Sequence, residues 1–373
     1  MATRISEVRD RRELDLFIEF PWRLYPEAFP CWVPPLRRER RDFLDPRKNP
    51  FFEFGEVGFF LARDDRGEIV GRIAAIVNPR HNQTHGDRTG FFGLFECRDD
   101  PEAAGALIEA AGGLLRARGL THLRGPVSLS LNDEAGLLTD GFDRPPMILM
   151  PYNPPYYESL LLGAGFRPGM TLFAYELGVP QTVPERLEQG ARLALARGRF
   201  VVRPVRLDDF DAEVRRVHSL YTAAWSENWG AVPMTDGEFR HLAAQLRPVI
   251  DPDLCYIAEA GGQPVGFSLA LPDFNQALRH ANGQLFPLGF LRLLWNQRHI
   301  DSLRIITLGV LKPWRRLGID ACFCAETCRH AIAKGLRRAE ASWILESNRP
   351  MRRALEKMGF TISKTYRLYD RPL

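Results

Sequence analysis

The chain has 373 residues, of which 45% are hydrophobic and 26% are charged, as is ordinary for a globular protein. This length exceeds what one compact core usually holds, so we expect two domains. The formal net charge of +4 is small for this length and favours neither a nucleic-acid partner nor a strongly acidic one.

The first half of the chain predicts alternating strands and helices. It begins with charged residues rather than a signal peptide, and no apolar run has the roughly 18 residues of a membrane span, so we expect a cytoplasmic protein. The expected elements, in chain order, are a strand at 4–8, a helix from Arg11, a hairpin of strands at 58–62 and 68–76, a strand at 90–95, a helix at 101–118, a strand at 121–125 and a helix from Asn153 to Phe166.

The second half repeats this order of elements. A repeat of this length indicates two homologous domains, which we place at 1–178 and 199–373 with a linker helix in 179–198. Each is expected to be an α/β unit with a mixed, mostly antiparallel sheet. The expected elements are a strand at 200–206, a helix at 209–226, a hairpin of strands at 254–259 and 264–271, a strand at 304–310, a helix from Ile319, a strand at 338–345, a helix at 350–358 and a strand at 362–369.

The cysteines and histidines do not predict a metal site. The six cysteines fit no common zinc spacing, so we interpret them as free thiols in a reducing compartment. His81 and His85 are interpreted as part of a polar loop, where no helix would align them on a metal.

A short apolar strand, 304–310, leads into a basic turn and then into a helix that begins near Ile319. Such a turn gathers backbone N–H groups and a helix N-terminus around one point, which suits a pyrophosphate. The residues expected at this anion site are Leu308, Gly309, Val310, Arg315, Arg316, Leu317, Gly318, Ile319 and Asp320, together with Asn348 about thirty residues further on.

The pattern Arg315-x-x-Gly318-x-Asp320, followed by Asn348 and then Gly359-Phe360, resembles the acyl-CoA site of the GCN5-related N-acetyltransferases, the GNAT superfamily. The family usually has glycine or alanine where this chain has Asp320, whose charge repels a pyrophosphate. The resemblance covers nearly the whole chain and implies two tandem GNAT domains, each with a splayed sheet flanked by helices. It also implies N-acyltransferase activity with acyl-CoA as a substrate and without a metal.

The first half lacks the glycine turn. Its strand 90–95 is followed by Glu96, Asp99 and Asp100, which are carboxylates where a pyrophosphate would lie. We therefore expect coenzyme A to bind the second half alone. An extra segment, 128–143, is either part of the acceptor pocket or an ordinary surface loop.

Amide formation from a thioester requires an oxyanion donor and a base for the amine. In the family a backbone N–H near the end of the pyrophosphate strand serves the oxyanion, which corresponds here to Gly309 or Val310. By strand alternation Glu340 and Glu346 share one face, so either could be the base, and Glu346 is our first choice because it precedes the expected cleft.

A general acid is less clearly indicated. The family often has a tyrosine just before its Gly-Phe pair, and this chain has Leu355 at that position. Tyr366 or Tyr369 in the last strand could substitute, although tyrosines in strands are commonly packing residues.

The acceptor residues are expected between the hairpin and the pyrophosphate strand. Asp273 and Asn275 could face the acceptor, and the apolar segment 285–295, with Phe290 and Leu294, could line a channel for an acyl chain or a lipid amine. The same segment could instead be a core helix or pack between the domains, or it could contact a membrane surface.

Within the superfamily, the two-domain layout and the run Glu340–Asn348 resemble bacterial two-domain acyltransferases, including ceramide synthases that join a fatty acyl group to a sphingoid base. This resemblance implies a lipid amine as acceptor. Acetylation of a small polar amine, or a non-catalytic acyl-CoA-binding scaffold, remain alternatives. The acyl-chain length and the oligomeric state are left open.

Overall fold

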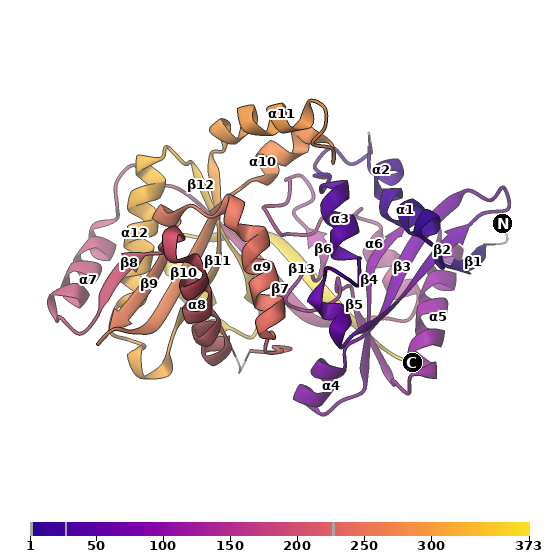
Figure 1. Ribbon diagram of the computed structural model, residues 1–373, viewed down its shortest axis with the longest axis horizontal. Helices are drawn as coiled ribbons and strands as arrows, with labels where there is room; N and C mark the ends of the chain where they lie inside the picture. Colours follow the sequence, from indigo (N-terminus) through magenta and orange to yellow (C-terminus); the bar gives the residue numbers. More distant parts are fainter. Residues whose placement is uncertain (1–2, 27, 226–227) are drawn as a thin grey trace.

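The computed structural model describes residues 3–26, 28–225 and 228–373. In these residues the strands join into one continuous open sheet, with helices on both faces (Figure 1). The strands are β1 (Arg4–Glu7), β2 (Glu56–Arg63), β3 (Ile69–Val77), β4 (Thr89–Cys97), β5 (His122–Gly125), β6 (Leu137–Asp140), β7 (Arg167–Gly178), β8 (Val201–Pro204), β9 (Cys255–Ala260), β10 (Gln263–Pro272), β11 (Ser302–Val310), β12 (Arg338–Leu345) and β13 (Thr361–Pro372).

The helices that the sequence predicts are present, together with others that it does not predict. They are α1 (Arg11–Glu19), α2 (Pro21–Leu24), α3 (Arg37–Phe43), α4 (Pro79–His85), α5 (Pro101–Ala117), α6 (Tyr157–Gly163), α7 (Glu185–Ala196), α8 (Phe210–Trp225), α9 (Asp236–Leu246), α10 (Asn275–Leu278), α11 (Gly289–Asn296), α12 (Ile319–Ala333) and α13 (Arg349–Lys357).

The two halves exchange their last strands. The order across the sheet is β1-β2-β3-β4-β5-β13-β7-β12-β11-β10-β9-β8, so β13 pairs with β5 of the first half, and β7 pairs with β12 of the second. Figure 1 shows β13 crossing from the second half to end beside the first. The core follows the exchange, because Tyr369 packs in the cluster around α5 while Tyr175 packs with Leu303 and Leu355. The exchange joins the two halves of the sheet through the backbone.

Each half opens its sheet between two parallel strands. β4 pairs with β5 only from Thr89 to Phe91, and β11 pairs with β12 only from Ser302 to Ile305. Beyond Ile305 the described part of the chain supplies no strand between β11 and β12, so the two strands diverge toward their C-terminal ends. The mixed, splayed sheet predicted for each half is confirmed.

Helices on the two faces of the second half have separate roles. On one face α12 packs with α7, and their contact includes Ala191, Ala194 and Phe323. On the other face α8 packs against β10, through Leu220 and Phe267. This second face also turns toward the first half, so a space between the halves is bounded by α8 and α9.

The segment from Asn78 to His85 is a helix and not the loop that we predicted. Asn78 caps α4 by accepting a hydrogen bond from the His81 N–H, Pro79 occupies its first turn, and Gly86 ends it in the left-handed conformation. His81 is buried, and burial lowers its pKa to about 4. The described residues contain no cluster of three or more metal-ligating side chains.

Among the helices in the described ranges, none combines the length and apolar character needed to cross a bilayer.

α7 lies within the predicted linker 179–198. We retain 1–178 and 199–373 as the proposed domain limits, although each exchanged strand pairs with a strand of the other domain.

Candidate active site

The predicted anion site is a strand, a turn and a helix N-terminus in direct succession. β11 ends at Val310, a short 3₁₀ turn covers Lys312–Trp314, and α12 starts at Ile319. Gly318 is the N-cap, with φ at 87°, and has no side chain to occupy the N–H groups of the first turn. The uncapped N–H groups and the helix dipole are therefore available to bind an anion.

The turn is held from both sides. Arg315 folds back so that its Nε donates to the Val310 carbonyl at 3.0 Å. On the other side α7 lies so close that a Cβ at Gly318 would be 2.6 Å from the Cβ of Ala194. The linker helix thus requires glycine at this position for space, as well as for backbone conformation.

The equivalent helix of the first half is already capped by an anion. Asp100 Oδ1 accepts hydrogen bonds from the N–H groups of Glu102 at 2.9 Å and Ala103 at 3.1 Å. A side-chain carboxylate therefore occupies the position that a phosphate would take at the start of α5. This geometry supports the prediction that only the second half binds coenzyme A.

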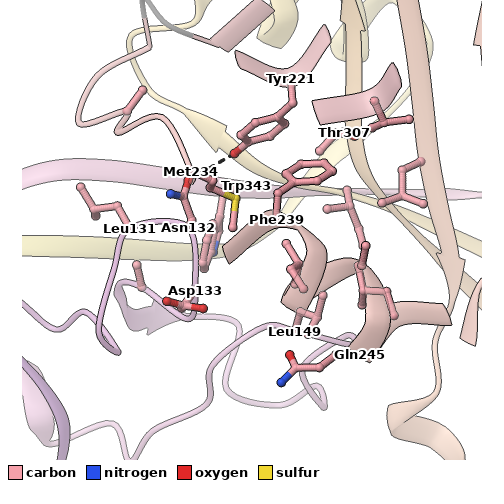
Figure 2. A pocket seen from close by; sticks show the side chains of 18 of the residues that line it. Leu131, Asn132, Asp133, Leu149, Tyr221, Met234, Phe239, Gln245, Thr307 and Trp343 are labelled. Atoms are coloured by element: carbon pink, nitrogen blue, oxygen red, sulfur yellow. Dashed lines mark hydrogen bonds between the residues drawn. The ribbon is translucent and has the colours of Figure 1, made fainter. Parts of the chain in front are cut away.

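A cavity of about 390 Å³ lies beside the splay, between the two halves of the chain. This volume is in the usual range for small-molecule sites. Figure 2 shows rings of Tyr221, Phe239 and Trp343 around it. Its apolar lining comes from α8, α9 and strands β10 to β12, and includes Val214, Val217, Leu242, Leu246, Leu269, Ile306 and Leu345.

Two polar atoms in the cavity wall lack partners. Thr307 Oγ1 and Trp343 Nε1 are buried, and neither has a hydrogen-bond partner in the described ranges. Both belong to the splayed strands, one on β11 and the other on β12. A buried donor without a partner is costly, so a ligand that accepts hydrogen bonds here would remove that cost.

One end of the cavity is acidic and comes from the first half. Glu39, Asp133 and Glu134 line it together with Arg40, whose guanidinium contacts Glu39 and Glu134. Asp133 accepts a hydrogen bond from Ser130 Oγ at 2.9 Å rather than an ion pair from Arg40. Burial, with Glu134 and Glu238 nearby, raises the pKa of Asp133 to about 7. This end suits an ammonium group, and Asp133 can exchange a proton near neutral pH.

Glu340 on β12 and Glu346 just beyond its end lie on opposite faces, which corrects our prediction that they share one. The register against β7 shifts between Ala341 and Ile344, which places one extra residue in β12 and reverses the alternation. Glu340 therefore faces the same side as Ser342, whereas Glu346 follows the end of the strand and is exposed.

Glu340 lies in a buried polar network. It accepts hydrogen bonds from Ser342 Oγ at 2.7 Å and from Lys364 Nζ at 3.3 Å, and Lys364 is on β13. Arg304 Nε donates to the same Ser342 oxygen at 2.9 Å, and Arg304 lines the cavity. Glu340 itself does not line it, so this network supports the cavity wall from behind.

Comparison with known proteins identifies the family. The Acetyltransferase (GNAT) family model matches residues 214–360. A Caulobacter vibrioides protein named bacterial ceramide synthase is 38% identical over 99% of this chain and 97% of its own length. Protein YghO of Escherichia coli is 34% identical over 98% of this chain and 94% of its own.

The chain belongs to the GNAT acetyltransferase family. Solved structures agree in fold. A tandem GNAT protein from the clavulanic acid biosynthesis pathway, 13% identical, covers 100% of this chain and 98% of its own with a TM-score of 0.56. A GNAT protein from Anabaena variabilis, 12% identical, covers 99% of this chain and 72% of its own with a TM-score of 0.53. The chain is thus an N-acyltransferase of tandem GNAT architecture, as its sequence predicts.

The remaining predicted GNAT site residues lie in different surroundings. Tyr366 is buried, and its hydroxyl has no hydrogen-bond partner in the described residues. Tyr369 belongs to the part of β13 that completes the first half, and its hydroxyl donates to Glu158. Asn348 caps α13 by accepting from the Met351 N–H at 3.3 Å. Their parts in catalysis or coenzyme A binding stay predictions.

Asp273 and Asn275 line a second, polar cavity of about 320 Å³ beneath α10 and not the apolar one. Asp273 accepts from the Ile148 N–H at 2.9 Å, and burial raises its pKa to about 7. Phe290 and Leu294 line neither cavity, because α11 is exposed. The interpretation of segment 285–295 as a buried channel wall or a core helix is therefore wrong.

Sequence reasoning missed most of the cavity lining of this GNAT protein. α9 was not predicted, although Thr235 and Glu238 form a capping box that is visible in the sequence as Thr-x-x-Glu. Asp133 lies in the extra segment 128–143, which we interpreted either as part of the acceptor pocket or as an ordinary surface loop. Thr307 and Trp343 carried no signal of their own, since only the splay makes them neighbours of one cavity.

Proposed function

We propose that this GNAT protein transfers a long acyl group from acyl-CoA to the primary amine of an amphipathic lipid, such as a sphingoid base. The observation that carries the proposal is the cavity beside the splay, which is apolar along α8 and α9 and acidic at Asp133. A long apolar chain matches the first part, and a protonated amine matches the second.

The donor would bind at the turn before α12. The N–H groups around Gly318 and the start of α12 would bind the pyrophosphate, with Arg315 and Arg316 supplying positive charge. The pantetheine arm would then enter between β11 and β12, where backbone groups lack a neighbouring strand. A backbone N–H at Gly309 or Val310 would meet the thioester oxygen, a contact typically worth about 2.7–4 kcal/mol in the transition state.

Asp133 is our preferred base for the amine. The bound ammonium first releases one proton to solvent and becomes the neutral amine. Its nitrogen then forms a C–N bond, the C–S bond breaks, the second proton leaves the nitrogen, and coenzyme A departs as its thiolate. Asp133 lines the cavity and titrates near neutral pH, so it could take that proton. Glu346 and Glu340 remain the sequence-based alternatives, one exposed and the other fully buried behind the wall.

The name of the Caulobacter relative supports a lipid acceptor. That protein is named bacterial ceramide synthase, and it matches this chain over nearly its full length. A sphingoid base carries hydroxyls beside its amine, and these could accept from Thr307 and Trp343. Since such an amine resides in membranes, a peripheral membrane contact is part of the proposal.

The test is coenzyme A release by the full chain. Acyl-CoAs from acetyl to about eighteen carbons would be combined in turn with a sphingoid base and with spermidine. Because each buried methylene contributes about 0.8 kcal/mol, we expect strong preference for long acyl chains with the sphingoid base. Equal rates at all lengths, or preference for acetyl-CoA with spermidine, would contradict the lipid assignment. Absence of release with every amine would favour a scaffold.

A further inference from the structure

The segment from Leu285 to Trp295 forms an unusually exposed apolar surface. Phe286 is 87% exposed, Trp295 is 65% exposed and Leu291 is 60% exposed. Single exposed apolar residues are ordinary, but a contiguous group indicates a contact with another surface. We define the α11 surface as Phe286, Leu288, Phe290, Leu291, Leu294 and Trp295.

The helix presents four of these six side chains on one face, and Phe286 and Leu288 precede it. Residues 290, 291, 294 and 295 recur at helical spacing, so they lie within one continuous stripe of α11. Gly289 is the buried residue of the helix and marks its inner side. Figure 1 shows α11 at the upper edge of the molecule, outside the layers that cover the sheet. The stripe therefore faces outward.

The fold holds this surface in place. The Arg37 N–H donates to the Gly283 carbonyl at 3.0 Å, and Arg37 Nη1 donates to the Asn282 carbonyl at 2.8 Å. A Cβ at Gly283 would be 2.7 Å from Trp22. The base of the segment is thus fixed on the first half, so the exposed side chains are presented by a built structure.

Charge distinguishes between the possible occupants. Residues 274–300 contain Arg279, Arg292, Arg298 and two histidines, and no aspartate or glutamate. Arg292 and Arg298 are exposed and form no ion pair within the described residues, whereas Arg279 lines the second, polar cavity with Asp273. A second copy of this chain docking symmetrically would bring one basic surface against another. An anionic bilayer complements both the apolar stripe and the flanking arginines.

We propose that the α11 surface is a docking site for anionic membranes, with the helix lying in the plane of the bilayer interface. Its apolar side chains would enter the boundary between headgroups and acyl chains, and its arginines would contact lipid phosphates. The purpose of this contact rests on the proposed function, because a membrane-bound acyltransferase meets lipid amines at the surface. The binding itself needs neither substrate nor turnover.

The experiment is vesicle co-sedimentation of the full chain without substrates. Vesicles of phosphatidylcholine alone would be compared with vesicles that contain about 30% phosphatidylglycerol. We expect binding to the anionic vesicles at least about tenfold tighter, and weakened by salt. Phe286→Ser with Trp295→Ser should lower that binding by at least about tenfold, and Arg292→Glu with Arg298→Glu should remove the preference for anionic lipid.

Leu193→Ser is the matched control, since Leu193 is 61% exposed on α7 and lies outside the α11 surface. It should leave vesicle binding unchanged. No binding of wild type to anionic vesicles, or equal binding by wild type and Phe286→Ser/Trp295→Ser, would overturn the proposal. Concentration-dependent dimers that Phe286→Ser/Trp295→Ser abolishes would assign the surface to a second copy instead. Coenzyme A release with a dispersed short-chain amine tests the proposed function separately.

Discussion

Lys364 of β13 donates a hydrogen bond to Glu340 of β12 at 3.3 Å, although the two strands are separated by β7. Their side chains are 2% and 0% exposed. The pair connects the exchanged strand to the strand that bears Trp343. The pair therefore links β13, which joins the two halves of the sheet, to β12, which forms one wall of the cavity.

Removing one member of this pair should be far more damaging than removing an exposed pair. Lys364→Met removes the cation that is hydrogen-bonded to this buried carboxylate and leaves only Arg304 nearby, so we expect the free energy of unfolding to fall by about 3–5 kcal/mol. Glu340→Gln with Lys364→Met should recover much of that loss. The matched control is Glu56→Gln, which breaks the exposed pair with Arg118 and should cost under about 1 kcal/mol. Chemical denaturation measures all three.

Two reasons for glycine at position 318, the close approach of α7 and the left-handed backbone, can be tested separately. Gly318→Ala forces a left-handed backbone on alanine, at about 1–3 kcal/mol, and adds a clash with Ala194. Gly335→Ala carries the first cost alone, because Gly335 has φ at 70° and open space around it. We expect Gly318→Ala to lower both thermal stability and coenzyme A affinity more than Gly335→Ala. Addition of Ala194→Gly should restore part of both. Equal effects of the two single substitutions would contradict a role for the α7 contact.

Thr307→Val should separate ligand binding from folding. The Thr307 hydroxyl is buried without a partner, so its removal should leave stability unchanged or slightly raised while increasing KM for the acceptor severalfold. Thr139→Val is the control, because Thr139 Oγ1 donates to the Thr365 carbonyl at 3.3 Å and its loss should lower stability by about 1 kcal/mol. An unchanged KM for Thr307→Val would remove the hydroxyl from the binding site.

If Asp133 is the base, the reaction rate should depend on pH in a specific way. The base must be deprotonated, so kcat/KM should rise with pH through about 7 and then level off. Asp133→Asn should lower kcat by about 10²–10⁴ and abolish that rise, whereas Glu346→Gln, the matched variant at an exposed position, should change neither. If Glu346→Gln loses activity and Asp133→Asn does not, the original sequence-based choice is the correct base.

The same carboxyl also affects stability, and the sign follows from proton binding. The pKa of Asp133 is raised in the folded state above the ordinary value of about 3.9, so the folded protein binds more protons between about pH 4 and about pH 7. The free energy of unfolding should therefore fall as pH rises through this window. Asp273 has a pKa raised to about 7 and contributes in the same direction. Asp133→Asn should remove its share of the slope.

The local parts of the site could be predicted from the sequence. The turn before Ile319 has its own signature of glycine, arginines and a following helix, and each repeated strand and helix has a periodicity. The prediction that the first half does not bind coenzyme A also rests on local sequence, and the Asp100 cap before a proline-initiated helix supports it. These features depend on residues close together in the chain.

The parts that failed depend on distant residues. No local pattern predicts that β13 pairs with β5, because the sequence of a strand does not determine which strand it pairs with. The bulge in β12, which separates Glu340 from Glu346, arises from pairing with β7. Segment 285–295 is apolar enough for a core, and only the fold shows that nothing in the described residues covers it. Asp133 becomes a candidate base only when the first half closes the cavity.

We propose that the cavity between the halves holds the apolar chain of a substrate. Val217 on α8 lines it, and Val217→Trp would shorten the space while leaving the turn before α12 untouched. The most direct measurement is coenzyme A release against chain length for this variant, beside Val201→Trp at the exposed, non-lining Val201 as control. We expect Val217→Trp to move the preferred length to shorter chains and to keep turnover on them, while Val201→Trp matches wild type. An unchanged length profile for Val217→Trp would contradict it.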